Sequence, residues 1–199
     1  MILPLGPEAV AVVWRSMTHF VWFLTRATGV VAMVLIVAAL LWGFLFSARE
    51  TGRRLRPAWW LDLHNYLGGL GLLFVGLHIV ASMVDDRSGI GLVQALVPGT
   101  SDDGRWAIGW GVIASYLLAA AVFTSWPRRL ANRRWWRGIH LTTTFGTGMA
   151  LIHGFLAGTD AGAAWFVALL LAAVAVSIYA GGLRLMTVLE HRTRSRASA

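Results

Sequence analysis

The stretch from Leu61 to Val84 decides the fold of this 199-residue chain; it reads LDLHNYLGGLGLLFVGLHIVASMV. As a helix it is long and apolar enough to cross a hydrocarbon core of about 30 Å. His64 and His78 lie inside it, and ionisable side chains within hydrocarbon are costly and usually functional. The fourteen positions between them turn an α-helix through about 1400°, close to four whole turns, so the histidines share a face about 21 Å apart along the axis. The spacing indicates two sites stacked along one helix.

Glycine occupies the same face. Gly71 lies midway between the two histidines, and Gly68 and Gly76 leave further gaps in the stretch. A glycine lets a flat, wide ligand approach the backbone closely. Glycines are also typical of close packing between membrane helices, and the two roles are compatible. We predict that Gly71 contacts a bound cofactor.

A later apolar stretch, IHLTTTFGTGMALIHGFLA at residues 139–157, carries His140 and His153. These two fall roughly 140° out of phase in a straight helix, because thirteen positions turn it through about 1300°. Overwinding, a kink or a different approach of each side chain to its ligand would reconcile the spacing. We expect the distortion within residues 142–148. The remaining histidines, His19 and His191, are expected at the surface.

The composition is that of a polytopic membrane protein with one membrane domain, since 57% of the residues are hydrophobic and 13% are charged. The chain has no cysteine, which excludes disulfides, thiolate metal sites and iron–sulfur clusters. Its net charge of +8 rests on 17 arginines and no lysine. These arginines lie in loops beside apolar stretches, so we attribute the charge to membrane topology and not to nucleic-acid binding.

The arginines predict the orientation of five membrane spans, at residues 20–47, 61–84, 107–126, 139–157 and 163–183. Thirteen arginines fall on one side, in the two segments that follow the first and third spans and in the tail. By the positive-inside rule this side is cytoplasmic, so the N-terminus is outside. We predict an all-α integral protein of the plasma membrane. Its parts are an outer interfacial segment at residues 1–19, a transmembrane domain at 20–184 and a basic cytoplasmic tail at 185–199.

This topology makes the two histidine stretches parallel and sets the heights of their histidines. His64 and His140 each lie near the cytoplasmic end, whereas His78 and His153 each lie near the outer end. Charge distribution and histidine spacing are independent signals, and together they predict the pairs His64–His140 and His78–His153. We interpret the four histidines as axial ligands of two stacked b-type haems inside a five-span helical bundle.

The pattern H-x13-H on one helix and H-x12-H two helices later resembles the ferric reductase-like transmembrane domain family, over nearly the whole chain. That family includes NADPH oxidases, yeast ferric reductases and the haem subunit of the bacterial periplasmic methionine-sulfoxide reductase. The resemblance implies a helical bundle that binds b haems and passes electrons across the membrane. The stretch TRATG around Arg26 is similar to the arginine-bearing span that precedes the first histidine helix in the family.

Arg26 lies about six positions inside the outer end of the first span, roughly 9 Å down. Snorkelling to the outer surface is one interpretation of its position. None of the five spans offers a carboxylate near that depth, whereas a haem brings two propionates. A guanidinium binds a carboxylate through two parallel hydrogen bonds. We predict that Arg26 contacts a propionate of the outer haem.

Two departures from the family pattern bear on the electron donor and acceptor. Larger members continue into a cytoplasmic flavin and nicotinamide domain, whereas about fifteen residues follow the last span here, without a glycine-rich nucleotide loop. We expect a separate flavoprotein or a quinol as the donor, and ferric iron or a partner redox protein as the extracytoplasmic acceptor. Oxidase members carry another histidine one turn after the outer ligand; Ser82 at this position argues against superoxide production.

Two other functions stay open on the sequence alone. The first is a transporter in which the histidines relay protons or bind a transition-metal ion. Its weakness is a shortage of carboxylates, because Asp62 is the only one near the start of a histidine stretch. The second is a haem-bearing anchor that mainly docks a soluble enzyme.

Overall fold

The computed structural model describes residues 7–48, 57–125 and 133–197, and within these ranges it is helical, with no strand. The predicted all-α class is therefore confirmed. Pro57 begins its helix, at the position where the missing N–H of proline costs nothing. The arginine-rich segments at 49–56 and 126–132 lie outside the described residues. The helices are α1 (Pro7–Ala48), α2 (Pro57–Val84), α3 (Leu92–Leu96), α4 (Arg105–Ser125), α5 (Arg133–Ala157) and α6 (Ala164–Ala197).

Four helices of the described chain are long and apolar enough to cross a membrane, which indicates a multi-pass membrane protein. They contain four of the five predicted spans, within α1, α2, α4 and α6. Helix α5 holds the fifth and is not among them, although it is 25 residues long. Its histidines, threonines and terminal arginines make it more polar than the others.

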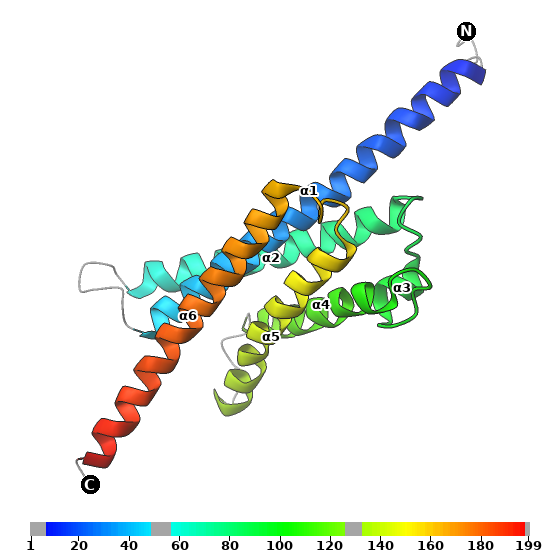
Figure 1. Cartoon of the computed structure of the whole chain (residues 1–199). Coiled ribbons are helices and arrows are strands. Elements are labelled where there is room, and N and C mark those ends of the chain that lie inside the picture. Colours follow the sequence, from blue (N-terminus) through cyan, green and yellow to red (C-terminus); the bar gives the residue numbers. More distant parts are fainter. Residues whose placement is uncertain (1–6, 49–56, 126–132, 198–199) are drawn as a thin grey trace.

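Helices α1 and α6 extend beyond the predicted spans. α1 is one helix of 42 residues, so residues 7–19 continue the helix of the first span toward the N-terminus (Figure 1). α6 likewise continues to Ala197 and takes in most of the predicted tail. The borders at residues 20 and 185 stay predictions about the membrane. His19 is exposed, as expected, whereas the side chain of His191 lies outside the described part of the chain.

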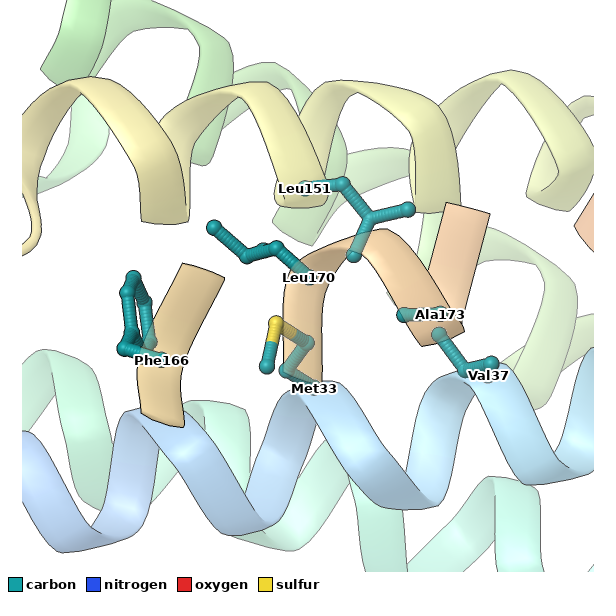
Figure 2. Packing of buried hydrophobic residues seen from close by; sticks show 6 residues of the cluster. All are labelled: Met33, Val37, Leu151, Phe166, Leu170 and Ala173. Carbon is teal, nitrogen blue, oxygen red and sulfur yellow. The ribbon is translucent and has the colours of Figure 1, made fainter. Parts of the chain in front are cut away.

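Helix α1 lies at the centre of the bundle and packs on both sides. One face meets α5 and α6 in a cluster of buried apolar side chains, and α6 lies between the other two helices in this view (Figure 2). An adjoining face, through Ala32 and Ile36, meets Leu118 of α4, with Phe74 of α2 packed beside them. Close van der Waals packing of this kind drives association of helices in lipid. The first cluster consists of Met33, Val37, Leu151, Phe166, Leu170 and Ala173.

The segment between α2 and α4 closes one end of the bundle. It contains the short helix α3 and turns at Gly89, Gly99 and Gly104, whose φ angles of 63°, 83° and 69° favour glycine. The hydroxyl of Tyr116 on α4 donates a hydrogen bond to the carbonyl of Leu96 and anchors α3. This end also carries the short link between α5 and α6, at residues 158–163.

Candidate functional site

The four histidines of α2 and α5 meet in two pairs. The ring centres of His64 and His140 lie 5.7 Å apart, with an angle of 66° between the planes. Those of His78 and His153 lie 6.1 Å apart, with an angle of 71°. These are the pairs that the topology predicts, so the two histidine helices place their side chains at matching heights.

The outer pair, His78 and His153, is held by backbone carbonyls of neighbouring helices. The ring nitrogen Nδ1 of His78 donates to the carbonyl of Thr25 on α1 over 2.9 Å. In the same way, Nδ1 of His153 donates to the carbonyl of Ala107 on α4 over 2.8 Å. A carbonyl oxygen can only accept, so the proton in each bond belongs to the imidazole.

A glycine makes each of these approaches possible. A Cβ on Gly29 would lie 3.0 Å from Nδ1 of His78, and one on Gly111 would lie 2.8 Å from Nδ1 of His153. Each glycine stands four residues after the accepting carbonyl, one helical turn along the same face. Any side chain at these positions would push the imidazole away from its acceptor.

His64 of the inner pair repeats this arrangement. Its Nδ1 donates to the carbonyl of Ala39 on α1 over 3.0 Å. Gly43, again four residues later, would bring a Cβ within 3.0 Å of Cε1 of the ring. Three histidines on two different helix pairs therefore share one device, a carbonyl acceptor followed one turn later by a glycine.

These hydrogen bonds determine which nitrogen is free to bind a metal. Because Nδ1 carries the proton in His64, His78 and His153, the neutral ring keeps its lone pair on Nε2. A ligating histidine in proteins typically donates its other ring N–H to a carbonyl or carboxylate, which fixes the tautomer and the ring orientation. The three histidines are thus arranged as metal ligands are.

His140 is the exception. Its Nδ1 is buried and has no hydrogen-bond partner among the residues that the structure describes. The ring instead stacks on Trp136, one turn earlier on α5, with centres 5.0 Å apart and 18° between the planes. The indole N–H of Trp136 donates to the hydroxyl of Ser125 at the end of α4 over 3.1 Å. The inner pair is therefore held by one carbonyl and one stacked indole.

Helix α5 brings both histidines to their partners without a break. The α-helix is continuous through residues 142–148, where the sequence led us to expect a distortion. The phase difference is accommodated by the side chains, since His153 reaches a carbonyl of α4 and His140 does not. Of the three explanations offered by the sequence, a different approach of each side chain fits the structure.

A cavity of about 530 Å³ adjoins the outer pair. Its wall includes His78, His153 and Gly111, together with Ser88 from the segment between α2 and α4 and Thr159 from the link between α5 and α6. Cofactor sites are typically concave, largely apolar and of about 300–1,000 Å³. The outer histidines thus face a space of the size that a large planar cofactor requires.

Arg26 lies at the wall of this cavity and is bound to Asp160 in the link between α5 and α6. Its Nε donates to Oδ2 of Asp160 over 2.8 Å, and Nη2 donates to Oδ1. The guanidinium also lies 4.1 Å from the ring centre of Trp22. The spans hold no carboxylate at this depth, as the sequence indicated, but the link supplies one that sequence reasoning missed. Arg26 and Asp160 are 25% and 15% exposed, so the pair is largely shielded.

The apolar candidates occupy different places. Gly71 is buried against α1, where a Cβ would lie 3.3 Å from Ile36 and 3.5 Å from Leu35, which agrees with its helix-packing role. Its contact with a cofactor stays a prediction. Phe74 packs against the α1–α4 cluster between the heights of the two pairs. Phe145 on α5 is 71% exposed and is not part of this cluster.

The donor set fits a haem better than a bare metal ion. In the described ranges, no three histidine, aspartate or glutamate side chains gather into a group that could hold a metal. A protein zinc site requires three or four such ligands. A haem iron takes its equatorial ligands from the porphyrin and needs only axial ligands from the protein. Two imidazoles on opposite sides of one metal have ring centres roughly 6 Å apart, because each metal–nitrogen bond is about 2 Å long. Both observed distances agree with this value.

The sequence contains a signal for the glycines that we did not identify from it. Gly29 and Gly43 on α1 are separated by the same number of positions as His64 and His78 on α2. Antiparallel helices that keep one register place such residues opposite one another, because both rise about 1.5 Å per residue. A glycine spacing on one helix that copies a histidine spacing on the next therefore indicates ligand support.

The comparison with protein families agrees with these observations. Residues 28–151 match the model of the ferric reductase like transmembrane component. The match takes in His64, His78 and His140 and ends just before His153. Neither the search of curated proteins nor that of solved structures gave a match. Since the family model spans more than half of the chain, the protein belongs to the ferric reductase-like transmembrane family.

Proposed function

We propose that the protein is a transmembrane electron conduit that binds two b-type haems, one between His64 and His140 and one between His78 and His153. The two facing histidine pairs, with Nε2 free in the three histidines whose tautomer is fixed, carry this proposal. Membership of a family of transmembrane reductase components supports it. Each bound haem would supply a one-electron iron couple.

The residues of the chain have three tasks in this function. The histidines on α2 and α5 hold two redox centres stacked along the membrane normal, about 21 Å apart by the rise of α2. The carbonyls of Thr25, Ala39 and Ala107 orient three of these ligands and raise their basicity. The apolar packing of α1, α4 and α6 excludes water from the interior.

We further propose that α5 is the fifth span, which makes the bundle a five-span protein of the plasma membrane. Its pairing with α2 along both histidine heights requires it to lie at the same depth. The N-terminal end of α1 and the C-terminal end of α6 lie at opposite ends of the bundle in Figure 1, as expected for an odd number of spans. The concentration of arginine on one side supports a cytoplasmic C-terminus and an outer N-terminus.

Electrons would enter from a cytoplasmic flavoprotein or from a quinol and leave to ferric iron or a redox protein outside the membrane. The family supports a reductase role and does not identify either partner. Ser82, one turn after His78, donates its hydroxyl to the carbonyl of His78 and offers no imidazole near the outer pair. This favours an acceptor other than oxygen.

Arg26 and Gly71 complete the proposed site. Arg26 donates two hydrogen bonds to Asp160 and lies on the wall of the outer cavity. Its charge would therefore act on the outer haem with or without a direct contact to a propionate. A propionate would share the guanidinium with Asp160. Gly71 would admit a porphyrin edge beside the contact between α1 and α2.

The visible spectrum of the purified protein tests the proposal. We expect a b-type α-band after reduction with dithionite and two haems per chain. The same preparation should bind zinc no better than a variant in which His64 and His140 are alanine. A colourless protein that binds zinc through these histidines would overturn the proposal and indicate a metal transporter.

A further inference from the structure

We infer that Trp136, held by Ser125, positions His140 in place of the backbone carbonyl that each of the other three histidines uses. The inference rests on the proposed haem function and concerns the inner pair alone. It assigns a ligand-positioning role to two residues that the sequence analysis did not single out. The other three histidines each have a carbonyl acceptor followed one turn later by a glycine, and His140 has neither within the described ranges.

The register of α4 against α5 locates the carbonyl that His140 would use. His153 bonds the carbonyl of Ala107, and the helices are antiparallel, so thirteen positions back along α5 correspond to thirteen positions forward along α4. This brings His140 opposite Ala120. The same register holds between the two heights, because a Cβ on Gly146 would lie 3.6 Å from the carbonyl oxygen of Ala114.

The residue that corresponds to Gly111 is then Thr124, not a glycine. Its hydroxyl donates to the carbonyl of Ala120 over 2.7 Å. The next residue, Ser125, donates in the same way to the carbonyl of Ala121 over 2.7 Å. Both carbonyls at this height are therefore occupied by hydroxyls of their own helix, and no glycine follows them one turn later.

Ser125 has a second use. While its hydroxyl proton is donated to Ala121, its oxygen accepts the indole N–H of Trp136. This bond fixes the indole, and the indole plane lies 18° from that of His140. The sequence of contacts Ala121–Ser125–Trp136–His140 thus runs from the backbone of α4 to the ligand ring, as the single carbonyl bond does elsewhere.

The two devices differ in what they do to the imidazole. A carbonyl acceptor fixes the ring and also makes it a more basic ligand. Stacking fixes the plane of the ring and gives Nδ1 no acceptor within the described part of the chain. His140 is therefore oriented but not strengthened as a ligand. The orientation of the His140 ring depends on Trp136, whereas the ligands of the outer haem do not depend on this side chain.

Four variants test this role, with the low-spin ferric signals of the two haems in electron paramagnetic resonance and their midpoint potentials as readouts. Trp136→Leu removes the stacked ring and should change or abolish the signal of the inner haem. Trp136→Phe keeps an aromatic face and should restore most of it. Ser125→Ala should shift the inner signal by less. Trp135→Leu is the matched control, because Trp135 is adjacent on α5 and 74% exposed; it should change nothing.

The unchanged signal of the outer haem reports that each variant has folded. Trp136→Leu with both signals and both potentials as in the wild type would overturn the inference. If Trp136→Leu also loses the outer haem, Ser125→Ala decides the question, because an inner signal unaltered in Ser125→Ala would reject the inference. Wild-type protein without haem would instead reject the proposed function.

Discussion

The outer and inner histidine pairs each bring together one imidazole from α2 and one from α5, but they differ in their surroundings. At the outer pair, both rings donate to backbone carbonyls that are followed one turn later by a glycine. A cavity with the Arg26–Asp160 ion pair in its wall adjoins these rings. At the inner pair, His64 does the same while His140 stacks on an indole. The outer pair is therefore built from backbone groups, and half of the inner pair is built from side chains.

This difference determines which substitutions can alter the surroundings of each histidine pair. A backbone carbonyl cannot be altered by substitution, and it can be blocked only by adding atoms at the glycine. An indole and a hydroxyl can be exchanged one at a time. If the proposed haems are bound, substitutions at Trp136, Ser125 and Thr124 can adjust the inner one, whereas changes at the outer one act through Arg26 and Asp160 nearby.

The largest effect is expected from filling the space behind an outer ligand. A Cβ at Gly111 would lie 2.8 Å from Nδ1 of His153, so Gly111→Ala must displace the imidazole from the carbonyl of Ala107. Overpacking costs about 1–3 kcal/mol, which corresponds to about 5- to 150-fold weaker retention of the outer haem. Haem content per chain after purification measures it. Thr124→Ala is the control at the matching position of α4, and it should retain both haems; equal haem loss in the two variants would contradict the proposed support.

The next largest effects are expected at Arg26 and Asp160, because replacing either should shift the midpoint potential of the outer haem, in opposite directions. Arg26→Ala removes a positive charge beside the cavity and should lower the midpoint potential of the outer haem or release it. Asp160→Asn leaves the guanidinium without its compensating charge and should raise that potential. Hydrogen bonds to charged groups contribute about 1.5–3 kcal/mol, so both changes should be measurable by redox titration. Potentials that do not move in Arg26→Ala would show that Arg26 acts on Asp160 alone.

A smaller effect is expected when the inner pair is given the missing carbonyl. Thr124→Gly removes the hydroxyl that occupies the carbonyl of Ala120 and places a glycine one turn after it, as at the other three histidines. A bond from His140 to this carbonyl would make the ligand more basic and favour the oxidised iron. The inner midpoint should shift to more negative values while the outer midpoint stays constant. Thr124→Ser, which keeps the hydroxyl, is the control and should leave both values unchanged.

The smallest effect concerns the entry of electrons on the arginine-rich side. Neutralising Arg128 and Arg129, which lie outside the described residues, should slow reduction by an acidic donor a few-fold at low salt. The difference should shrink at high salt, because screening weakens interactions between exposed charges. Stopped-flow reduction at two ionic strengths measures it. A rate that is independent of both charge and salt would leave topology as the sole role of these arginines.

Much of the fold follows from the sequence because spans and ligands obey simple periodicities. Helix positions, the all-α class and the two histidine pairs all derive from apolar length, arginine distribution and the 3.6-residue turn. The helix ends do not, since α1 continues to Pro7 and α6 to Ala197 through residues that no membrane requires to be apolar. The family match agrees with the resemblance carried by the histidine spacing.

The supporting residues of the site were harder to predict because they act through the backbone. The acceptor of His78 is a carbonyl, and carbonyls leave no trace in a sequence except through the glycine that exposes them. Asp160 lies in the six-residue link between α5 and α6, and it reaches Arg26 because that link lies beside the interior of α1.

The pairing of the histidines is tested most directly by haem analysis of four single alanine variants. His64→Ala and His140→Ala should each remove the same inner haem, and His78→Ala and His153→Ala should each remove the other. Reduced spectra and redox titrations of membranes from the four strains identify which component is lost. If His64→Ala and His153→Ala instead lost the same component, α2 and α5 would not hold one haem at each end, and the two-haem conduit would be contradicted.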